Sequence, residues 1–334
     1  MNKNLYISIA ASIIGIVIIE FVFNPAGATL LVGLSLMTAM VQGVLVFLAG
    51  AELSHGTWHN RVKYKLIDLH PLLYMAPIVF LIFSRNVNIY PWVQSHPNAW
   101  LTPDFMIWRN FFLLLVTAII GSLFAGAIRK NKQSAKKIAV FYVLSYVTTN
   151  SFIGIDWVMS LEHPWISTMF PALYFVEGGM LGLAATIIFI VFSGLGNLSD
   201  WKKELRDYAI LLLGFGLFWG GLQYAQFLTI WYGNLPEEVS YFYHRIHHPE
   251  LGSLIYLVLI MGFVVPFAGL IPRVVKTMNW YVVSVAIIVI IGLVLERILH
   301  IAPVAEINYP FMVLELIILF IPFVIFVLSE KSRS

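Results

Sequence analysis

Ten apolar segments separated by short polar connections dominate this sequence and restrict the chain to a membrane-embedded fold. The segments lie near residues 5–23, 28–51, 69–85, 110–128, 138–155, 167–193, 208–232, 252–271, 280–299 and 309–328. As helices, segments of about 20 apolar residues match the roughly 30 Å hydrocarbon core of a bilayer. Hydrophobic residues make up 60% of the 334 positions and charged residues only 11%. We therefore predict an all-α polytopic membrane protein with about ten transmembrane helices in a single integral membrane domain, residues 1–334.

The basic residues alternate between the two ends of these predicted helices. Most of them gather at the N-terminus, in every second connection and at the C-terminus: Lys3, Arg61, Lys63, Lys65, Arg129, Lys130, Lys132, Lys136, Lys137, Lys202, Lys203, Arg206, Arg273, Lys276, Lys331 and Arg333. The others, Arg85, Arg109, Arg245 and Arg297, belong to the opposite side. Because basic loops stay in the cytoplasm, both termini are expected to be cytoplasmic, in a bacterial inner membrane.

The residue composition narrows the chemistry that this chain can carry. The sequence has 0 cysteines, which excludes disulfides, thiolate zinc sites, Cys-ligated iron–sulfur clusters and C-x-x-C-H haem attachment. None of the 9 histidines lies well inside an apolar segment, where a b-type haem would need its ligands. The histidines at 244–248 favour a polar loop over a metal site. We expect no metal and no cofactor bound by this chain. The basic inner face indicates contact with lipid rather than nucleic acid.

Three of the outer connections are rich in aromatic and polar residues. They span residues 86–109, 156–166 and 233–251. In any one of them, such residues could form only an aromatic belt and helix caps at the bilayer surface. Because three such connections share one face, we favour a docking surface for another protein.

Two longer motifs lie in and beside these connections. The first reads DWVMSLEHPWISTMF at 156–170, after TTNSFIGI, and the second reads QYAQFLTIWYGNLPEEV at 223–239, followed by Tyr241 and the pair His244-Arg245. Both resemble signatures of the NrfD-like membrane subunits of alternative complex III, most closely those of its second large membrane subunit. That bacterial assembly oxidises menaquinol and passes electrons to a cytochrome c or directly to an oxidase. The first motif departs from the family pattern at His163-Pro164 (Pro-His in the family), at Ile166 and at Met169-Phe170.

The resemblance implies an integral membrane subunit of a quinol-oxidising electron-transfer complex. It implies a pair of four-helix bundles plus flanking helices, a homologous NrfD-like membrane subunit alongside, and periplasmic multi-haem cytochrome and iron–sulfur subunits docked on the outer face. Haem c and iron–sulfur clusters would then belong to those partner subunits, with menaquinone as a candidate ligand in the membrane. The residues expected at the partner interface are Glu162, His163, Trp165, Ser167, Thr168, Trp231, Asn234, Glu237, Glu238 and Arg245.

Ionisable residues inside the apolar segments are functional candidates, because a charge at the bilayer centre costs at least ~2.5–3.5 kcal/mol. Glu177 is the strongest, since it lies about 15 Å into its segment at 1.5 Å per residue. Beside it, Gly178-Gly179 would let a neighbouring helix approach. A proton path from the outer face toward the bilayer centre is our hypothesis for the following set: Glu177, Glu315, Glu296, Asp156, Tyr224 and Glu20.

Other interpretations of these residues remain open. Glu296 with Arg297, and Asp156 with a nearby arginine, could be paired charges at helix ends. A quinone site would need an apolar cleft with groups that bond its carbonyls, and His163, Asp156 and Trp157 are the candidates. The chain could therefore be the quinone-reactive anchor of another NrfD-like reductase. A secondary transporter coupled to Glu177 and Glu315 is a further alternative, which predicts an inverted repeat with broken helices.

Overall fold

The computed structural model describes residues 3–95, 99–194 and 201–331, and in these residues the regular structure is helical, with no strand. Within the same residues, nine helical segments are long and apolar enough to cross a membrane: Lys3–Phe23, Thr29–Leu53, Lys63–Ile89, Pro103–Arg129, Ala135–Glu162, Phe170–Phe192, Lys202–Gly233, Asn279–Ile301 and Tyr309–Lys331. These nine candidate spans coincide with nine of the expected apolar segments. The prediction of an all-α, multi-pass membrane protein is therefore confirmed at this level.

The tenth expected segment, 252–271, forms a shorter helix. It consists of α11 (Leu254–Leu259), the π-helical turn η8 (Ile260–Val264) and α12 (Val265–Leu270). At 1.5 Å per residue it rises about 26 Å, somewhat less than a hydrocarbon core of ~30 Å. The described residues thus contain ten apolar helical segments, nine of them long enough to be candidate spans and one shorter.

The segment expected to be shortest, 69–85, is instead part of a long continuous helical rod. The rod runs through α3 (Lys63–Leu66), the 3₁₀-helix η2 (Ile67–Tyr74), α4 (Met75–Phe83) and the 3₁₀-helix η3 (Ser84–Ile89). Tighter 3₁₀ turns extend it at both ends, and Pro71 lies in one of them, where the α-helical hydrogen-bond pattern is already interrupted. Most of the rod is buried, so it packs inside the protein.

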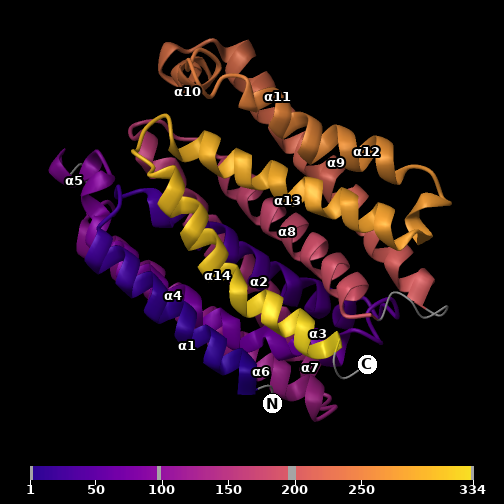
Figure 1. Ribbon diagram of the computed structural model, residues 1–334. Coiled ribbons are helices and arrows are strands. Elements are labelled where there is room, and N and C mark those ends of the chain that lie inside the picture. The colour runs from indigo at the N-terminus through magenta and orange to yellow at the C-terminus, as the bar shows by residue number, and fades with distance from the viewer. Residues whose placement is uncertain (1–2, 96–98, 195–200, 332–334) are drawn as a thin grey trace.

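Two groups of helices pack side by side, as Figure 1 shows. The first group contains α2 (Thr29–Leu53), α4, α6 (Pro103–Arg129) and α7 (Ala135–Ile153), and the second contains α8 (Phe170–Phe192), α9 (Lys202–Gly233), α11–α12 and α13 (Asn279–Ile301). The main contact between the groups is made by α2 with α8. Beside them, α1 (Lys3–Ile18) with the π-helical η1 (Ile19–Phe23) packs against α14 (Tyr309–Lys331), and α14 also contacts α2.

The two ends of the bundle carry different parts of the chain. At one end α1 begins and α14 ends, whereas α5 (Trp92–Ser95) and α10 (Pro236–Ile246) lie at the opposite end (Figure 1). We call the end with α5 and α10 the distal end. The first helix therefore begins at the same end of the bundle at which the last helix ends, as the alternation of basic residues predicts. The assignment of the distal end to the periplasm stays a prediction.

Small residues let α2 and α8 approach each other closely. A Cβ atom built on Gly43 of α2 would lie 2.0 Å from the carbonyl oxygen of Gly178, and one on Gly182 would lie 2.2 Å from the Gly43 carbonyl carbon. Such backbone contact between glycines is a common way for helices to associate in a membrane, where apolar side chains gain little by leaving lipid. The expectation that a neighbouring helix approaches at Gly178 is confirmed.

Gly43→Ala is therefore expected to destabilise the protein, because its methyl group would overlap the Gly178 carbonyl. Overpacking of this kind costs typically ~1–3 kcal/mol, and the measurement is the midpoint of thermal unfolding in detergent. The matched control is Gly50→Ala in the same helix, where an added Cβ has no atom within 4 Å. Equal unfolding midpoints for the two variants would contradict a close α2–α8 contact at Gly43.

Candidate functional site

The two sequence motifs meet at the distal end. Glu162, in the short 3₁₀-helix η5 (Met159–Glu162), accepts a hydrogen bond from Arg245 of α10 at 2.9 Å and lies 3.4 Å from the ring of His244. Trp165 stacks on Tyr241 with ring centroids 3.8 Å apart. The segment of η5 and the residues after it is thus held against α10 (Pro236–Ile246), the short helix that follows α9, by an ion pair and a ring stack.

Arg245 is the centre of this junction. Besides Glu162 it donates to the backbone carbonyl of His300, at 3.0 Å, and its guanidinium carbon lies 3.6 Å from the Tyr241 ring centroid. Burial raises the pKa of the Tyr241 phenol to about 12, so this ring stays neutral beneath the cation. Arg245 therefore ties together η5, α10 and the distal end of α13.

The predicted interface residues divide into an exposed set and a buried set. Thr168, Trp231, Asn234 and Glu237 are exposed, and Glu162, His163, Ser167 and Glu238 are partly exposed. Trp165 and Arg245 are buried, at 6% and 3% exposure. Their expected position on the docking surface is corrected: they hold that surface together from inside.

A hollow of about 630 Å³ lies between η5, α10 and the turn after α13, and Glu237 is the one exposed residue of the predicted set that lines it. Glu237, Glu238, His163 and His244 are among its lining residues. Asn234, with a positive φ of 47°, ends α9, and Pro236 begins α10. This sharp turn brings the acidic residues of α10 over the end of the bundle. Within the described residues, no group of three His, Asp or Glu side chains converges as a metal site.

A buried ion pair joins α8 and α13 inside the second group of helices. Arg297 donates to Glu177 at 2.6 Å, and both side chains are at most 1% exposed. Glu177 lies seven residues after Phe170, where α8 begins, so it is about 10 Å along the helix and not 15 Å as expected. Arg297 also lies 4.2 Å from the Tyr174 ring. The partner of Arg297 is Glu177, which corrects the interpretation of Glu296 and Arg297 as a pair of neighbouring helix-end charges.

Glu296 belongs to the same cluster but faces a different neighbour. Its Oε1 accepts hydrogen bonds from Trp219, at 3.2 Å, and Gln223, at 2.5 Å, both on α9. Its carboxyl also lies beside that of Glu177. One oxygen of each carboxyl, Oε1 of Glu177 and Oε2 of Glu296, has no hydrogen-bond partner in the structure. A single proton shared by these two carboxyls would leave the cluster with Arg297 electrically neutral.

The other predicted proton-path residues lie in separate places. Glu20 and Glu315 lie side by side, and Asn86 donates to Glu20 at 3.2 Å. Asp156 is held by Arg109, at 2.8 and 3.1 Å, and by Asn110 at 2.6 Å, as in the interpretation of a paired charge. The five predicted acids thus form three groups on different helices, and Tyr224, 63% exposed, lies on the outside of α9.

Two of these acids lie in π-helical turns that the sequence did not reveal. Glu20 is in η1, at the end of α1, and Asp156 is in η4 (Gly154–Val158), after α7. A π-helical turn inserts an extra residue into the helix and shifts the direction of the side chains beyond it, and such turns are frequent at functional sites. Each turn here places a carboxyl in the protein interior, at 1% and 0% exposure.

The three residues proposed for quinone binding do not line one cleft. Asp156 and Trp157 are both fully buried, and Trp157 donates to Asn110 at 3.1 Å and stacks on Phe80. His163 instead lines the distal hollow. Asp156 and Trp157 are therefore committed to internal contacts, which corrects the expectation of a quinone cleft at this point.

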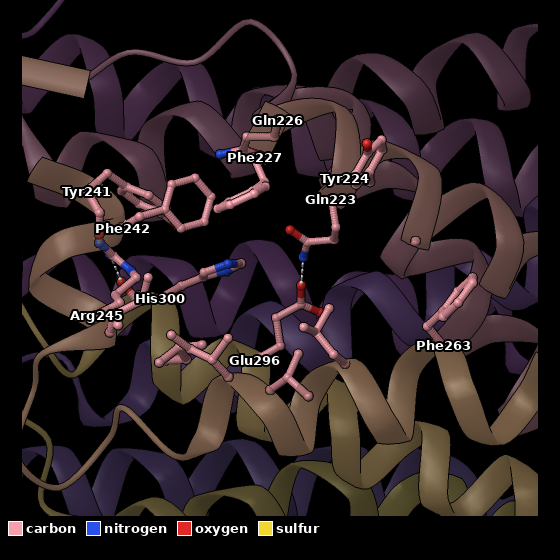
Figure 2. A pocket seen from close by; sticks show the side chains of 16 residues that line it. Gln223, Tyr224, Gln226, Phe227, Tyr241, Phe242, Arg245, Phe263, Glu296 and His300 are labelled. Atoms are coloured by element: carbon pink, nitrogen blue, oxygen red, sulfur yellow. Dashed lines mark hydrogen bonds between the residues drawn. The ribbon is translucent and has the colours of Figure 1, made fainter. Parts of the chain in front are cut away.

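A second cavity, of about 490 Å³, lies between α9, α10, α11 with η8, and α13. Figure 2 shows Glu296 and His300 reaching into it from α13, with Gln223 opposite Glu296 on α9. Most of its other lining residues are aromatic or aliphatic. His300 is a lining residue that sequence reasoning missed, because nothing in the local sequence indicates which helix faces it.

Removal of the Arg297 charge is expected to destabilise the protein strongly, because two carboxyls would remain buried without their cation. Loss of one partner of a buried pair typically costs ~3–5 kcal/mol, so Arg297→Met should lower the midpoint of thermal unfolding markedly. The double variant Glu177→Gln, Arg297→Met should recover part of the loss. Arg273→Met, at an exposed residue, is the control. No recovery in the double variant would contradict direct pairing.

No protein-family model and no curated protein matches this chain significantly. A function for it rests on the residues and contacts described above.

Proposed function

We propose that this chain is an NrfD-like integral membrane subunit of a quinol-oxidising electron-transfer complex of the alternative complex III type. The observation that carries the proposal is the junction of the two motifs at the distal end, where Glu162 binds Arg245 and Trp165 stacks on Tyr241. Segments that share a resemblance to one family also share one surface. In this proposal the distal end faces the periplasm.

The surface built on this junction suits a docked protein. It combines exposed acidic residues, Glu237 among them, with the large exposed rings of Trp231, Tyr232 and Tyr243. Aromatic side chains are enriched where proteins associate, and charges at the rim orient the partner. The buried junction beneath holds these groups in fixed positions, which reduces the entropy lost on binding. We assign to this surface the periplasmic multi-haem cytochrome and iron–sulfur subunits.

A role in proton conduction is supported by the cluster of Glu177, Glu296 and Arg297. Arginine keeps its charge in proteins, so the carboxyls must compensate for it. A second carboxyl beside the first gives the cluster two positions for one proton, next to the cavity between α9 and α13. A proton entering from this cavity would reach Glu296 first and Glu177 second. Glu20 with Glu315, and Asp156, form no part of this shorter route.

Assembly is tested by purification in mild detergent. The tagged chain should bring with it a multi-haem cytochrome and an iron–sulfur protein, detected by haem absorbance and by electron paramagnetic resonance. The variant Glu237→Lys, Glu238→Lys should reduce the retained haem several-fold, because it reverses the charge of the distal surface. Charge reversal at the other end of the bundle, Lys132→Glu, should retain the wild-type amount. A chain that purifies alone, with neither signal, would overturn the proposal.

The proton role is tested by substitution at the centre of the cluster. Glu177→Gln should lower the number of protons moved per electron in proteoliposomes, because an amide cannot take up and release a proton at this position. Glu306→Gln, at an exposed loop residue, is the control. An unchanged proton-to-electron ratio in an assembled Glu177→Gln complex would remove the proton role and leave the docking role intact.

A further inference from the structure

The turn between α6 and α7, residues 129–137, lies at the end of the bundle opposite the distal end (Figure 1). We propose that it binds the head group of an anionic phospholipid through Lys130, Lys136 and Lys137, while the acyl chains lie along the outer faces of α6 and α7. The inference goes beyond the proposed function and does not depend on it. Three features of this part of the chain support it.

The first feature is a group of exposed lysines without a carboxylate partner. In the part of the chain that the structure describes, no carboxylate lies within ion-pair distance of Lys130, Lys136 or Lys137. Lys136 donates to Nε2 of His55 at 2.7 Å, which leaves the positive charge of the lysine in place. From residue 105 to residue 155 the sequence contains no Asp or Glu. The charge of this turn is therefore available to an anion outside the chain.

The charge pairing at this turn differs from that of other basic residues at the same end of the bundle. Those residues contact carboxylates, in the pairs Lys63 with Glu52, Lys65 with Glu330, Arg61 with Glu204 and Arg129 with Asp68. The preference of basic residues for cytoplasmic connections applies to all of these side chains alike, so it does not explain why the three lysines have no acid beside them. A lipid with a negative head group supplies the missing charge, and each lysine near such a head group favours binding by about fivefold.

The second feature is the apolar surface that continues from the lysines along both helices. On α6 the exposed Leu123 lies seven residues before Lys130, and on α7 the exposed Phe141 lies four residues after Lys137. Residues separated by four or seven positions share a face of a helix. The two helices pack against each other, and both belong to candidate membrane spans. Each thus presents a cation at the membrane surface and apolar side chains deeper in the bilayer, which matches the structure of a phospholipid.

The third feature is an open space beside the lysines. Gly126 lies four residues before Lys130, on the same face of α6, and a Cβ atom built on it would have no atom within 4 Å. Another face of this helix is filled, because a Cβ atom on Gly121 would lie 2.4 Å from Cδ1 of Leu73. An acyl chain can therefore approach the backbone of α6 next to a head group held by Lys130.

The test is photolabelling of the purified protein, with whatever subunits accompany it, by a diazirine-labelled phosphatidylglycerol in phosphatidylcholine vesicles. The label is expected on α6, on α7 and on their turn, and added unlabelled phosphatidylglycerol should displace it, whereas added phosphatidylcholine should not. Label spread evenly over the lipid-facing helices would overturn the inference. Displacement by inorganic phosphate as effective as that by phosphatidylglycerol would also overturn it, because the turn would then bind a free anion.

Neutralising the lysines measures their contribution to this labelling. The first variant replaces the three lysines of the turn: Lys130→Gln, Lys136→Gln and Lys137→Gln. It should reduce the displaceable label on α6 and α7 at least about tenfold. The control variant removes the same charge from exposed residues at the start of α9, at the same end of the bundle: Lys202→Gln, Lys203→Gln and Arg206→Gln. It should leave the label unchanged, and equal losses in the two variants would overturn the inference, because only the total charge of this end would then matter.

Filling the space at Gly126 gives a second test, which leaves the charge intact. Gly126→Phe should reduce the displaceable label several-fold, because its ring would occupy the path of the acyl chain. The control is Gly214→Phe on α9, where an added Cβ likewise has no atom within 4 Å, and it should retain the wild-type labelling. Equal labelling of the two phenylalanine variants would overturn the inference even if the lysine variants fail to fold. None of these outcomes depends on haem or iron–sulfur signals in the preparation, so the proposed function is judged separately.

Discussion

The contact between Arg297 and Glu177 determines how the second group of helices is arranged. An arginine inside a membrane-spanning helix keeps its charge, so it needs a carboxyl within hydrogen-bond distance. Glu177 meets this need across the interface of α8 with α13. Once that pair is formed, Glu296 must face α9, where Trp219 and Gln223 donate to it, and His300 must lie one turn further along the same face. The pair thus sets the polar wall of the inner cavity.

Arg245 connects this cavity with the distal surface. The same side chain lines the cavity, binds Glu162 beneath the distal surface and donates to the His300 carbonyl. A shift of η5 or α10 on contact with another protein would therefore move a wall of the cavity and the end of α13. The two parts of the molecule share one buried residue, so a displacement at the distal surface would be transmitted to the cavity over a short distance.

The number and order of the long apolar helices could largely be predicted from sequence, whereas the partners of the buried polar groups could not. Lipid imposes a length and a polarity on every span, so nine of the expected segments were recovered as full-length spans. Glu296 and Arg297 are neighbours in sequence, but adjacent residues of a helix point in different directions, and Arg297 pairs with a residue 120 positions away. Trp165 and Arg245 lie in polar, aromatic connections, where exposed side chains are expected. They are buried because the two connections pack against each other. The π-helical turns at Glu20 and Asp156 leave no mark in the hydrophobic pattern.

The helix α2 has almost no surface left for lipid. Of its most apolar stretch 89% is buried, compared with 33% for the first span. During synthesis α2 precedes α7, α8 and α14, which enclose it in the finished protein. It must therefore enter the bilayer as a lipid-bathed segment and later exchange its lipid neighbours for protein on every side. Until α8 is synthesised, the backbone at Gly43 is open to acyl chains. The packing of α2 can therefore be completed only after α8 has entered the membrane.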